Sequence, residues 1–162
     1  MSLNPARVVR AVVFGALVVT MGAIGNGQTP VPGLGAWKLN VAKSKFTPGP
    51  APKSSAVTFT AAGQGFKAVI DTVGADGSKI HWEYTADFDG KPHPVTGNPD
   101  GDMVVIKRVN ATTVESMYTL KGKQTTVNTR VVAADGKTMT VTTKGTNAQG
   151  QKVDNMQMFE KA

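Results

Sequence analysis

The sequence predicts an all-β protein in which an antiparallel up-and-down meander of about eight to ten strands closes into a barrel. The first observation is alternation: from Lys79 to Phe88 the chain reads KIHWEYTADF, so that apolar and polar residues fall on opposite sides, as in a half-buried strand. The second observation is the regular spacing of turns: similar short segments follow to the C-terminus, separated by Gly, Asp and Asn turn residues.

The elements are expected in the following order. A lead-in with Pro and Gly, Gln28 to Gly35, precedes a first strand at Ala36 to Asn40. The next segment, Val41 to Lys53, has three prolines spaced two apart, which favours an extended, polyproline-like connector with at most a helical turn near Val41 to Lys45. The later segments rich in Val, Thr and aromatic residues are predicted strands: Ser54 to Thr60, Gly65 to Val73, Lys79 to Phe88, Met103 to Val109, Thr112 to Leu120, Gln124 to Ala133, Thr138 to Lys144 and Lys152 to Glu160.

The connections decide the topology. Most are short and have hairpin-turn composition, such as Ala75 to Ser78 and Ala134 to Lys137. Consecutive hairpins form a meander, and closure into a barrel removes its exposed edge strands. A two-sheet sandwich is the alternative, in which the long Gly- and Pro-containing link, Asp89 to Asp102, crosses between sheets instead of forming a loop at a barrel mouth.

The N-terminus resembles a secretory signal peptide. Arg7 and Arg10 precede an apolar run from Ala11 to Ile24, and small residues suggest cleavage after Gly25 or Gly27. We therefore expect a leader over residues 1–27, a single domain over residues 28–162, and a secreted or periplasmic location; an uncleaved anchor is the alternative. The absence of Cys means that the core alone stabilises the fold.

The charge is mildly basic. The whole chain has 18 Lys and Arg against 11 Asp and Glu, and removal of the two leader arginines leaves 16 against 11, or +5. These cations are scattered and have little aromatic surface between them, so we expect no nucleic-acid partner. No stable membrane insertion is expected after leader cleavage, and we expect a monomer.

Two short segments resemble the calycins, the group that contains lipocalins and cellular fatty-acid-binding proteins. Gly35-Ala36-Trp37-Lys38-Leu39 is similar to the G-x-W-K-L start of that group, and Thr140 to Lys144 with Phe159-Glu160-Lys161 is similar to the closing strands of the fatty-acid-binding branch. The chain also resembles a set of exported bacterial proteins of unknown activity with a G-x-W-K-L-N start and a P-V-T-G-N-P loop, here Pro94 to Pro99. The resemblance to the calycins implies a barrel that binds a small hydrophobic molecule.

The sequence departs from the fatty-acid-binding branch at the residues that matter for its ligand. That branch holds carboxylates with an Arg and a Tyr two residues apart on the final strand, and the matching positions here are Gln157 and Phe159. The Pro-rich connector also replaces its helical lid. The resemblance therefore favours a more open, lipocalin-like arrangement and does not transfer the ligand class.

Catalytic motifs are absent from the sequence, which has two histidines, no cysteine and no G-x-S-x-G, H-E-x-x-H or phosphate-binding loop. We expect neither an enzyme nor a cofactor. His81 is expected on the solvated face of its strand, whereas His93 lies between two prolines, where it contacts a ligand at the mouth or is simply a surface residue. Asp87, Asp89, Asp100 and Asp102 lack EF-hand spacing, so turns are favoured over a metal site.

Alternation identifies the candidate ligand contacts. Trp82, Tyr84 and Tyr118 fall on the predicted inner faces, together with Gln157 on an ambiguous final strand. Arg130 shares its face with Thr126, Asn128 and Val132; an arginine on a barrel strand more commonly points outward, but on an inner face it would hold an anionic head group. Trp37 and Phe159 are expected to be structural, with Trp37 closing one end of the barrel and packing against the last strand.

Three function classes follow from these observations. The favoured one is an exported lipocalin-like barrel that binds a small hydrophobic or amphipathic molecule in a cavity of a few hundred Å³ lined by the face of Trp82 and Tyr84. The second is a cell-envelope structural or interaction module with a filled barrel. An enzyme that joins His81 or His93 to a carboxylate is the third.

Overall fold

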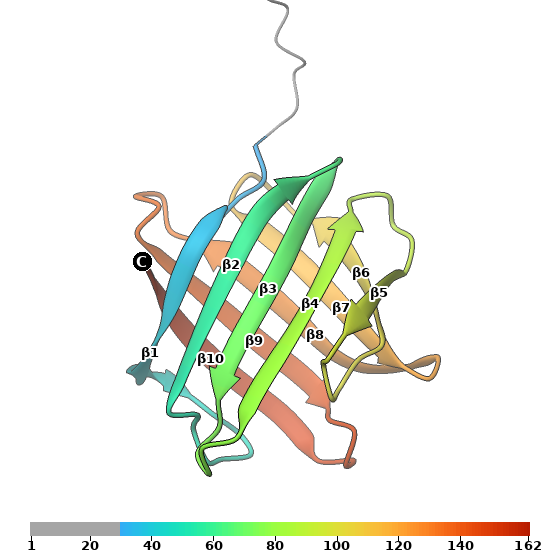
Figure 1. The fold of residues 1–162 in the computed structure, drawn as a ribbon. Helices are drawn as coiled ribbons and strands as arrows, with labels where there is room; N and C mark the ends of the chain where they lie inside the picture. Colours follow the sequence, from blue (N-terminus) through green and yellow to red (C-terminus); the bar gives the residue numbers. More distant parts are fainter. Residues whose placement is uncertain (1–29) are drawn as a thin grey trace, which may run out of the picture.

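The protein is a closed barrel of ten antiparallel strands (Figure 1). The computed structural model describes residues 30–162, so the predicted leader lies outside the described residues. Each strand pairs with its neighbours in sequence and β1 pairs with β10, which makes the barrel an up-and-down meander. The strands are β1 (Gly35–Lys45), β2 (Ser54–Ala62), β3 (Gly65–Val73), β4 (Lys79–Asp87), β5 (His93–Thr96), β6 (Met103–Arg108), β7 (Thr113–Leu120), β8 (Lys123–Val132), β9 (Thr138–Thr146) and β10 (Lys152–Lys161).

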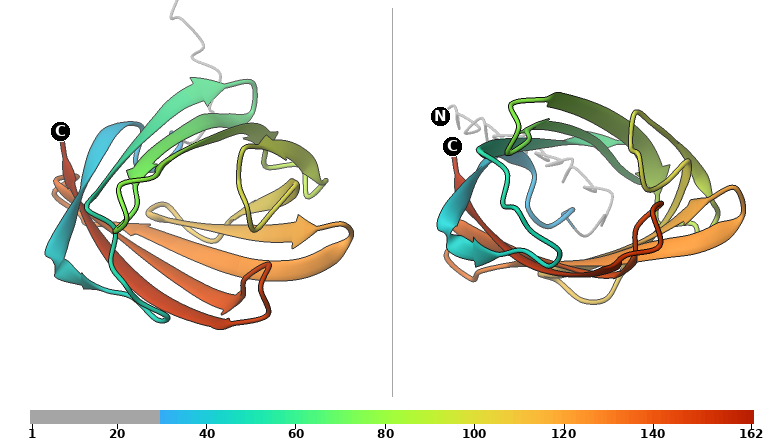
Figure 2. Two further views of the ribbon diagram at one scale, coloured as in Figure 1. Left: turned by 60° about the horizontal axis from the view of Figure 1, so that its bottom comes forward. Right: turned by 90° about the horizontal axis from the view of Figure 1, so that it is seen from below.

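This topology confirms the predicted all-β barrel and excludes the two-sheet sandwich. Viewed along its axis, the barrel is a flattened ring with β2 to β4 on one side and β8 to β10 on the other (Figure 2). From residue 30 onwards, the chain forms no helix long and apolar enough to cross a membrane.

The strand β5 lies inside the segment that was predicted to be one long loop. It is four residues long, contains Pro94, and pairs through only two residues with β4 and two with β6. The total of ten strands lies within the predicted range, but this strand was not predicted from the sequence because so short a segment, with a proline and no clear alternation, resembles a loop in sequence. Its pairing nevertheless completes the ring between β4 and β6.

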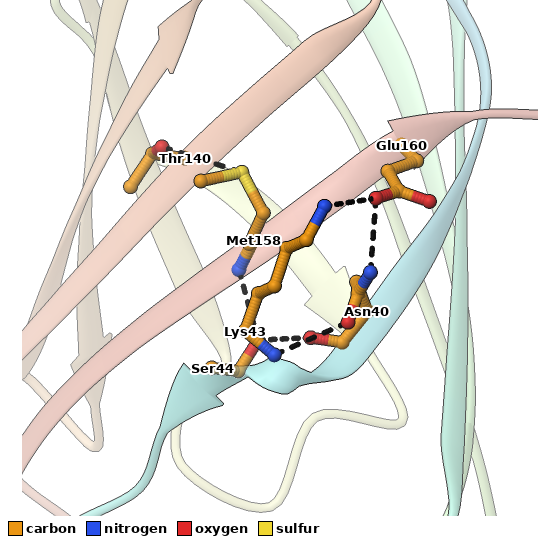
Figure 3. Close-up of polar contacts among 6 residues, drawn as sticks. All are labelled: Asn40, Lys43, Ser44, Thr140, Met158 and Glu160. Atoms are coloured by element: carbon orange, nitrogen blue, oxygen red, sulfur yellow. Dashed lines mark hydrogen bonds and ion pairs between the residues drawn. The ribbon is translucent and has the colours of Figure 1, made fainter.

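The pairing of β1 with β10, which we call the seam of the barrel, corrects the prediction for the segment after Asn40. The segment Val41 to Lys45 is not a helical turn; it continues β1, with a register shift against β10 between Asn40 and Lys45. At this irregularity the Met158 backbone N–H donates to Ser44 Oγ at 2.9 Å, and Ser44 Oγ donates to the Asn40 carbonyl at 2.7 Å (Figure 3). A side-chain hydroxyl thus links the two strands at the register shift.

Glu160 joins the same seam from β10. Its Oε1 accepts hydrogen bonds from Asn40 Nδ2 at 2.9 Å and from Lys43 Nζ at 3.1 Å (Figure 3). The hydrogen bond from Asn40, followed by that from Lys43, lowers the pKa of the Glu160 carboxyl below its ordinary value. These contacts hold the first and last strands together where their backbone pairing is irregular.

The core follows the alternation of the strands. The inner positions of β3, Phe66, Ala68 and Ile70, are all buried, and Phe66 packs against the rings of Phe59, Tyr84 and Phe88 with centroids 5.4 to 5.9 Å apart. Edge-on and tilted ring contacts of this kind add to the stabilisation from burial itself.

The residues before β1 close one end of this core. The part of the lead-in that lies before β1 and that the structure describes is residues 30–34, and the name is used for these residues from here on. The lead-in turns at residues 32–33, and Pro32 is buried. Three cations from alternate strands bind its carbonyl groups: Arg108 of β6 donates to Pro30 O, Arg130 of β8 to Pro32 O, and Lys161 of β10 to Leu34 O.

Trp37 completes the closure of this end. Its ring is 1% exposed, its Nε1 donates to Gly33 O at 2.7 Å, and Lys161 Nζ lies 4.3 Å from the ring centroid. Trp37 also pairs with Lys161 of the last strand. Trp37 therefore lies at the end of the barrel that the lead-in closes, beside the last strand.

Candidate ligand-binding site

The barrel contains an interior cavity of about 180 Å³. Residues from β2, β3, β4, β7, β8, β9 and β10 line it: Ser55, Val57, Phe59, Ile70, Thr72, Trp82, Tyr84, Ser116, Tyr118, Asn128, Arg130, Met139, Val141, Gln157 and Phe159. The lining is apolar and aromatic with a few polar groups, which is the composition of small-molecule pockets.

The cavity opens toward the end opposite the lead-in. A second hollow of about 320 Å³, which we call the mouth, is lined by the Pro-rich connector, the loop after β5 and the hairpin between β9 and β10, represented by Pro48, Asn98 and Asn147. The mouth and the cavity share five lining residues: Thr72, Trp82, Tyr118, Asn128 and Gln157. The two spaces therefore adjoin.

Aromatic side chains form one wall of the cavity. Trp82 and Tyr84 lie two apart on β4 and stack with ring centroids 6.0 Å apart, and Tyr118 of β7 meets both rings edge-on at 5.9 and 6.2 Å. Burial raises the pKa of the Tyr118 hydroxyl well above its ordinary value, so this group stays neutral. The wall thus presents flat aromatic surface together with the neutral hydroxyl group of Tyr118.

Arg130 points into the barrel, and this corrects the expectation that it faces outward. The residue is 5% exposed, and its guanidinium carbon lies 3.8 Å from the Phe59 ring centroid and 4.7 Å from that of Phe66. One terminal nitrogen donates to Pro32 O at 3.3 Å, whereas the buried Nε has no hydrogen-bond partner among the described residues. Sequence could not decide this orientation because both faces of β8 carry polar residues.

The electrostatic environment of Arg130 is unusual for a buried cation. The carboxylates of residues 30–162 form ion pairs with Lys43 and Lys67 and close contacts with His81 and His93, and none of these contacts involves Arg130. Burial lowers the pKa of its guanidinium, while Tyr84 and Tyr118 act in the opposite direction. An arginine nevertheless remains protonated in proteins, so the cavity holds a positive charge that, among residues 30–162, contacts two aromatic faces and one carbonyl.

The structure brings together most of the residues predicted to contact a ligand. Trp82, Tyr84, Tyr118, Arg130 and Gln157 all line the cavity, as does Phe159, which is 3% exposed and was expected to be structural.

His93 is not among the lining residues of either space. It begins β5, where its Nε2 lies 2.9 Å from Asp89 Oδ1, and the hydrogen bond with His93 is the largest cause that lowers the pKa of Asp89.

Several lining residues were not singled out from the sequence. Phe59 faces inward through the alternation of β2, and its contact with Arg130 depends on the barrel's curvature. Ser55 of β2 and Thr72 of β3 share a hydrogen bond of 2.8 Å between their hydroxyl groups at the cavity wall. Asn128 was recognised only as a neighbour of Arg130 on one face of β8.

The histidines and acidic residues form no metal site in the part of the chain that the structure describes, where no three His, Cys, Asp or Glu residues cluster. His81 lies on the outside of the barrel, with its Nδ1 2.7 Å from Asp71 Oδ1. Asp100 and Asp102 instead accept hydrogen bonds from the backbone N–H groups of Ala148 and Lys121. The contacts of Asp100 and Asp102 join separate loops.

Comparisons with known proteins give little further information. No protein-family model matches the chain, and no curated protein sequence matches it. One solved structure, of a zebrafish ileal bile acid-binding protein complexed with cholic acid, is similar with a TM-score of 0.45 and 9% sequence identity, over 80% of this chain and 98% of that chain. The closed ten-strand pairing described above defines the fold.

Proposed function

We propose that this barrel binds a small amphipathic molecule, with an anionic group at Arg130 and an apolar part against the wall formed by Trp82, Tyr84 and Tyr118. The observation that carries the proposal is the buried guanidinium with an unpartnered Nε in an otherwise largely apolar cavity. A buried charge is costly unless it is paired, and a carboxylate or similar anion is the partner that an arginine binds best. Export through the N-terminal leader is part of the proposal, and the intact mass of secreted protein tests it.

The size of the cavity limits the ligand. A volume of about 180 Å³ is only slightly larger than the engineered cavities of about 150 Å³ that hold one benzene molecule. The interior therefore suits an acid with a short apolar chain, whereas any longer ligand extends into the mouth. Octanoate is a suitable first probe on this basis.

A charge series with a constant chain tests the proposal. Octanoate, octanol and octylammonium are titrated into the protein by isothermal calorimetry after solvent extraction of bound material. We expect octanoate to bind at least about tenfold more tightly than octanol, because a charge-assisted hydrogen bond contributes roughly twice as much as a neutral one, and octylammonium to bind most weakly. Equal affinity of the protein for the three ligands would contradict the proposal that Arg130 binds the anionic group of the ligand. Absence of binding by all three would favour a barrel that works through its outer surface.

A further inference from the structure

The polar residues of β7 to β10 that line the cavity lie in two successive cross-strand rows. The deeper row runs across β7 to β10 through Val114, Arg130, Val141 and Gln157. The next row toward the mouth, which we call the neck row, runs through Ser116, Asn128, Thr143 and Asn155. Ser116 and Asn128 line the cavity, and Thr143 and Asn155 line the mouth. The passage between the two spaces is therefore polar and uncharged along this wall.

Within the neck row, Asn128 has an acceptor that the protein leaves unused. Its Oδ1 is buried and has no hydrogen-bond partner among the described residues. Asn155 differs, because its Oδ1 accepts a hydrogen bond of 2.8 Å from the Thr47 backbone N–H and so holds the Pro-rich connector. Other amide oxygens at the mouth also have hydrogen-bond partners within the protein. Asn98 Oδ1 accepts a hydrogen bond from the Asp100 N–H, and Asn147 Oδ1 accepts one from the Gln151 N–H.

The two unpartnered atoms of β8 require opposite kinds of hydrogen-bond partner. Arg130 Nε is a donor and pairs only with an acceptor, whereas Asn128 Oδ1 is an acceptor and pairs only with a donor. Leaving either atom unpaired in a buried site costs free energy that a complementary ligand recovers. A simple alkyl carboxylate satisfies the first atom and leaves the second without a partner.

We infer that the ligand carries, besides its anionic group, an uncharged hydrogen-bond donor such as a hydroxyl or amide N–H, which Asn128 Oδ1 accepts at the neck row. Neighbouring rows on one face of a strand are about 6.7 Å apart. The hydrogen-bond donor of the ligand is therefore separated from its anionic group by about this distance or more. Asn128 lines both the cavity and the mouth, whereas Arg130 lines the cavity alone, which puts the anionic end deeper. This inference rests on the proposed function.

The test compares matched acids on the wild-type protein. Hexanoate, octanoate and decanoate are titrated by calorimetry, each with and without a hydroxyl on its terminal carbon. We expect the hydroxyl to strengthen binding by about 3- to 10-fold at the chain length that places it against Asn128, as one added neutral hydrogen bond does. A hydroxyl that weakens binding or has no effect at all three lengths overturns the inference, although binding of the plain acids would still support the proposed function.

Variants separate the neck row from the charge. Asn128→Leu, similar in size and without an acceptor, is expected to abolish the preference for the hydroxylated acid over the plain acid of the same chain length. Thr129→Val is the matched control, because Thr129 is the neighbouring residue of β8 and lines neither space; it should keep the preference. A preference that survives in Asn128→Leu contradicts the assignment to Asn128. Should that variant not fold, the wild-type comparison decides, and failure of every acid to bind removes both the inference and the proposed function.

Discussion

Replacement of Arg130 by Met is expected to weaken octanoate binding by roughly 10- to 100-fold, which corresponds to the loss of one charge-assisted hydrogen-bonded contact. Octanol binding should change little, because the alcohol does not depend on the positive charge. Calorimetric titration of both ligands measures the two effects. The matched control is Arg108→Met: Arg108 also binds a lead-in carbonyl, that of Pro30, and lies 4.8 Å from the centroid of an aromatic ring, Phe88, but does not line the cavity.

The same variant carries a second, opposite expectation. Arg130→Met should leave the free energy of unfolding of the ligand-free protein unchanged or raise it, because it removes a buried charge that has no ion-pair partner among residues 30–162. Urea unfolding of the extracted protein checks this. A large loss of stability with unchanged octanoate affinity would show instead that Arg130 serves to fasten Pro32 of the lead-in.

Replacement of Phe66 by Ala is expected to lower the free energy of unfolding by about 3–5 kcal/mol, the usual cost of truncating a buried aromatic residue. Phe66 is 0% exposed and contacts the rings of Phe59, Tyr84 and Phe88 as well as the Arg130 guanidinium. Its loss therefore opens a cavity where several strands meet. Urea unfolding followed by tryptophan fluorescence measures the change.

The control for Phe66 is Val131→Ala, since Val131 is 41% exposed on the outside of β8. This change should stay within about 0.5 kcal/mol of the wild-type stability. A Phe66→Ala variant that loses less than Val131→Ala would mean that the aromatic cluster does not hold the barrel together, contrary to the packing described above.

The sequence predicted the fold and the aromatic wall because both depend on local alternation. The period of two through Trp82 and Tyr84, and through Ser116 and Tyr118, fixes which side of β4 and β7 faces inward once the sheet closes. Hairpin turns between neighbouring strands likewise fixed the meander, since each short connection forces antiparallel neighbours. These features need no knowledge of distant contacts.

The remaining features depend on contacts between distant parts of the chain. The strand β5 has only two paired residues on each side, so its conformation comes from β4 and β6 rather than from its own four residues. The inward direction of Arg130 reflects Phe59, Phe66 and Pro32, which are far from it in sequence. The unused acceptor of Asn128 can be recognised only when all its neighbours are placed.

Native mass spectrometry of protein secreted by its own host, taken without refolding and compared before and after solvent extraction, tests the central claim most directly. The account predicts a reproducible adduct that disappears on extraction and whose isolated component is an amphipathic acid small enough for the cavity of about 180 Å³ and the mouth beyond it. A ligand-free mass from fresh material, together with no binding of octanoate, would contradict the account and indicate a barrel that acts through its outer surface.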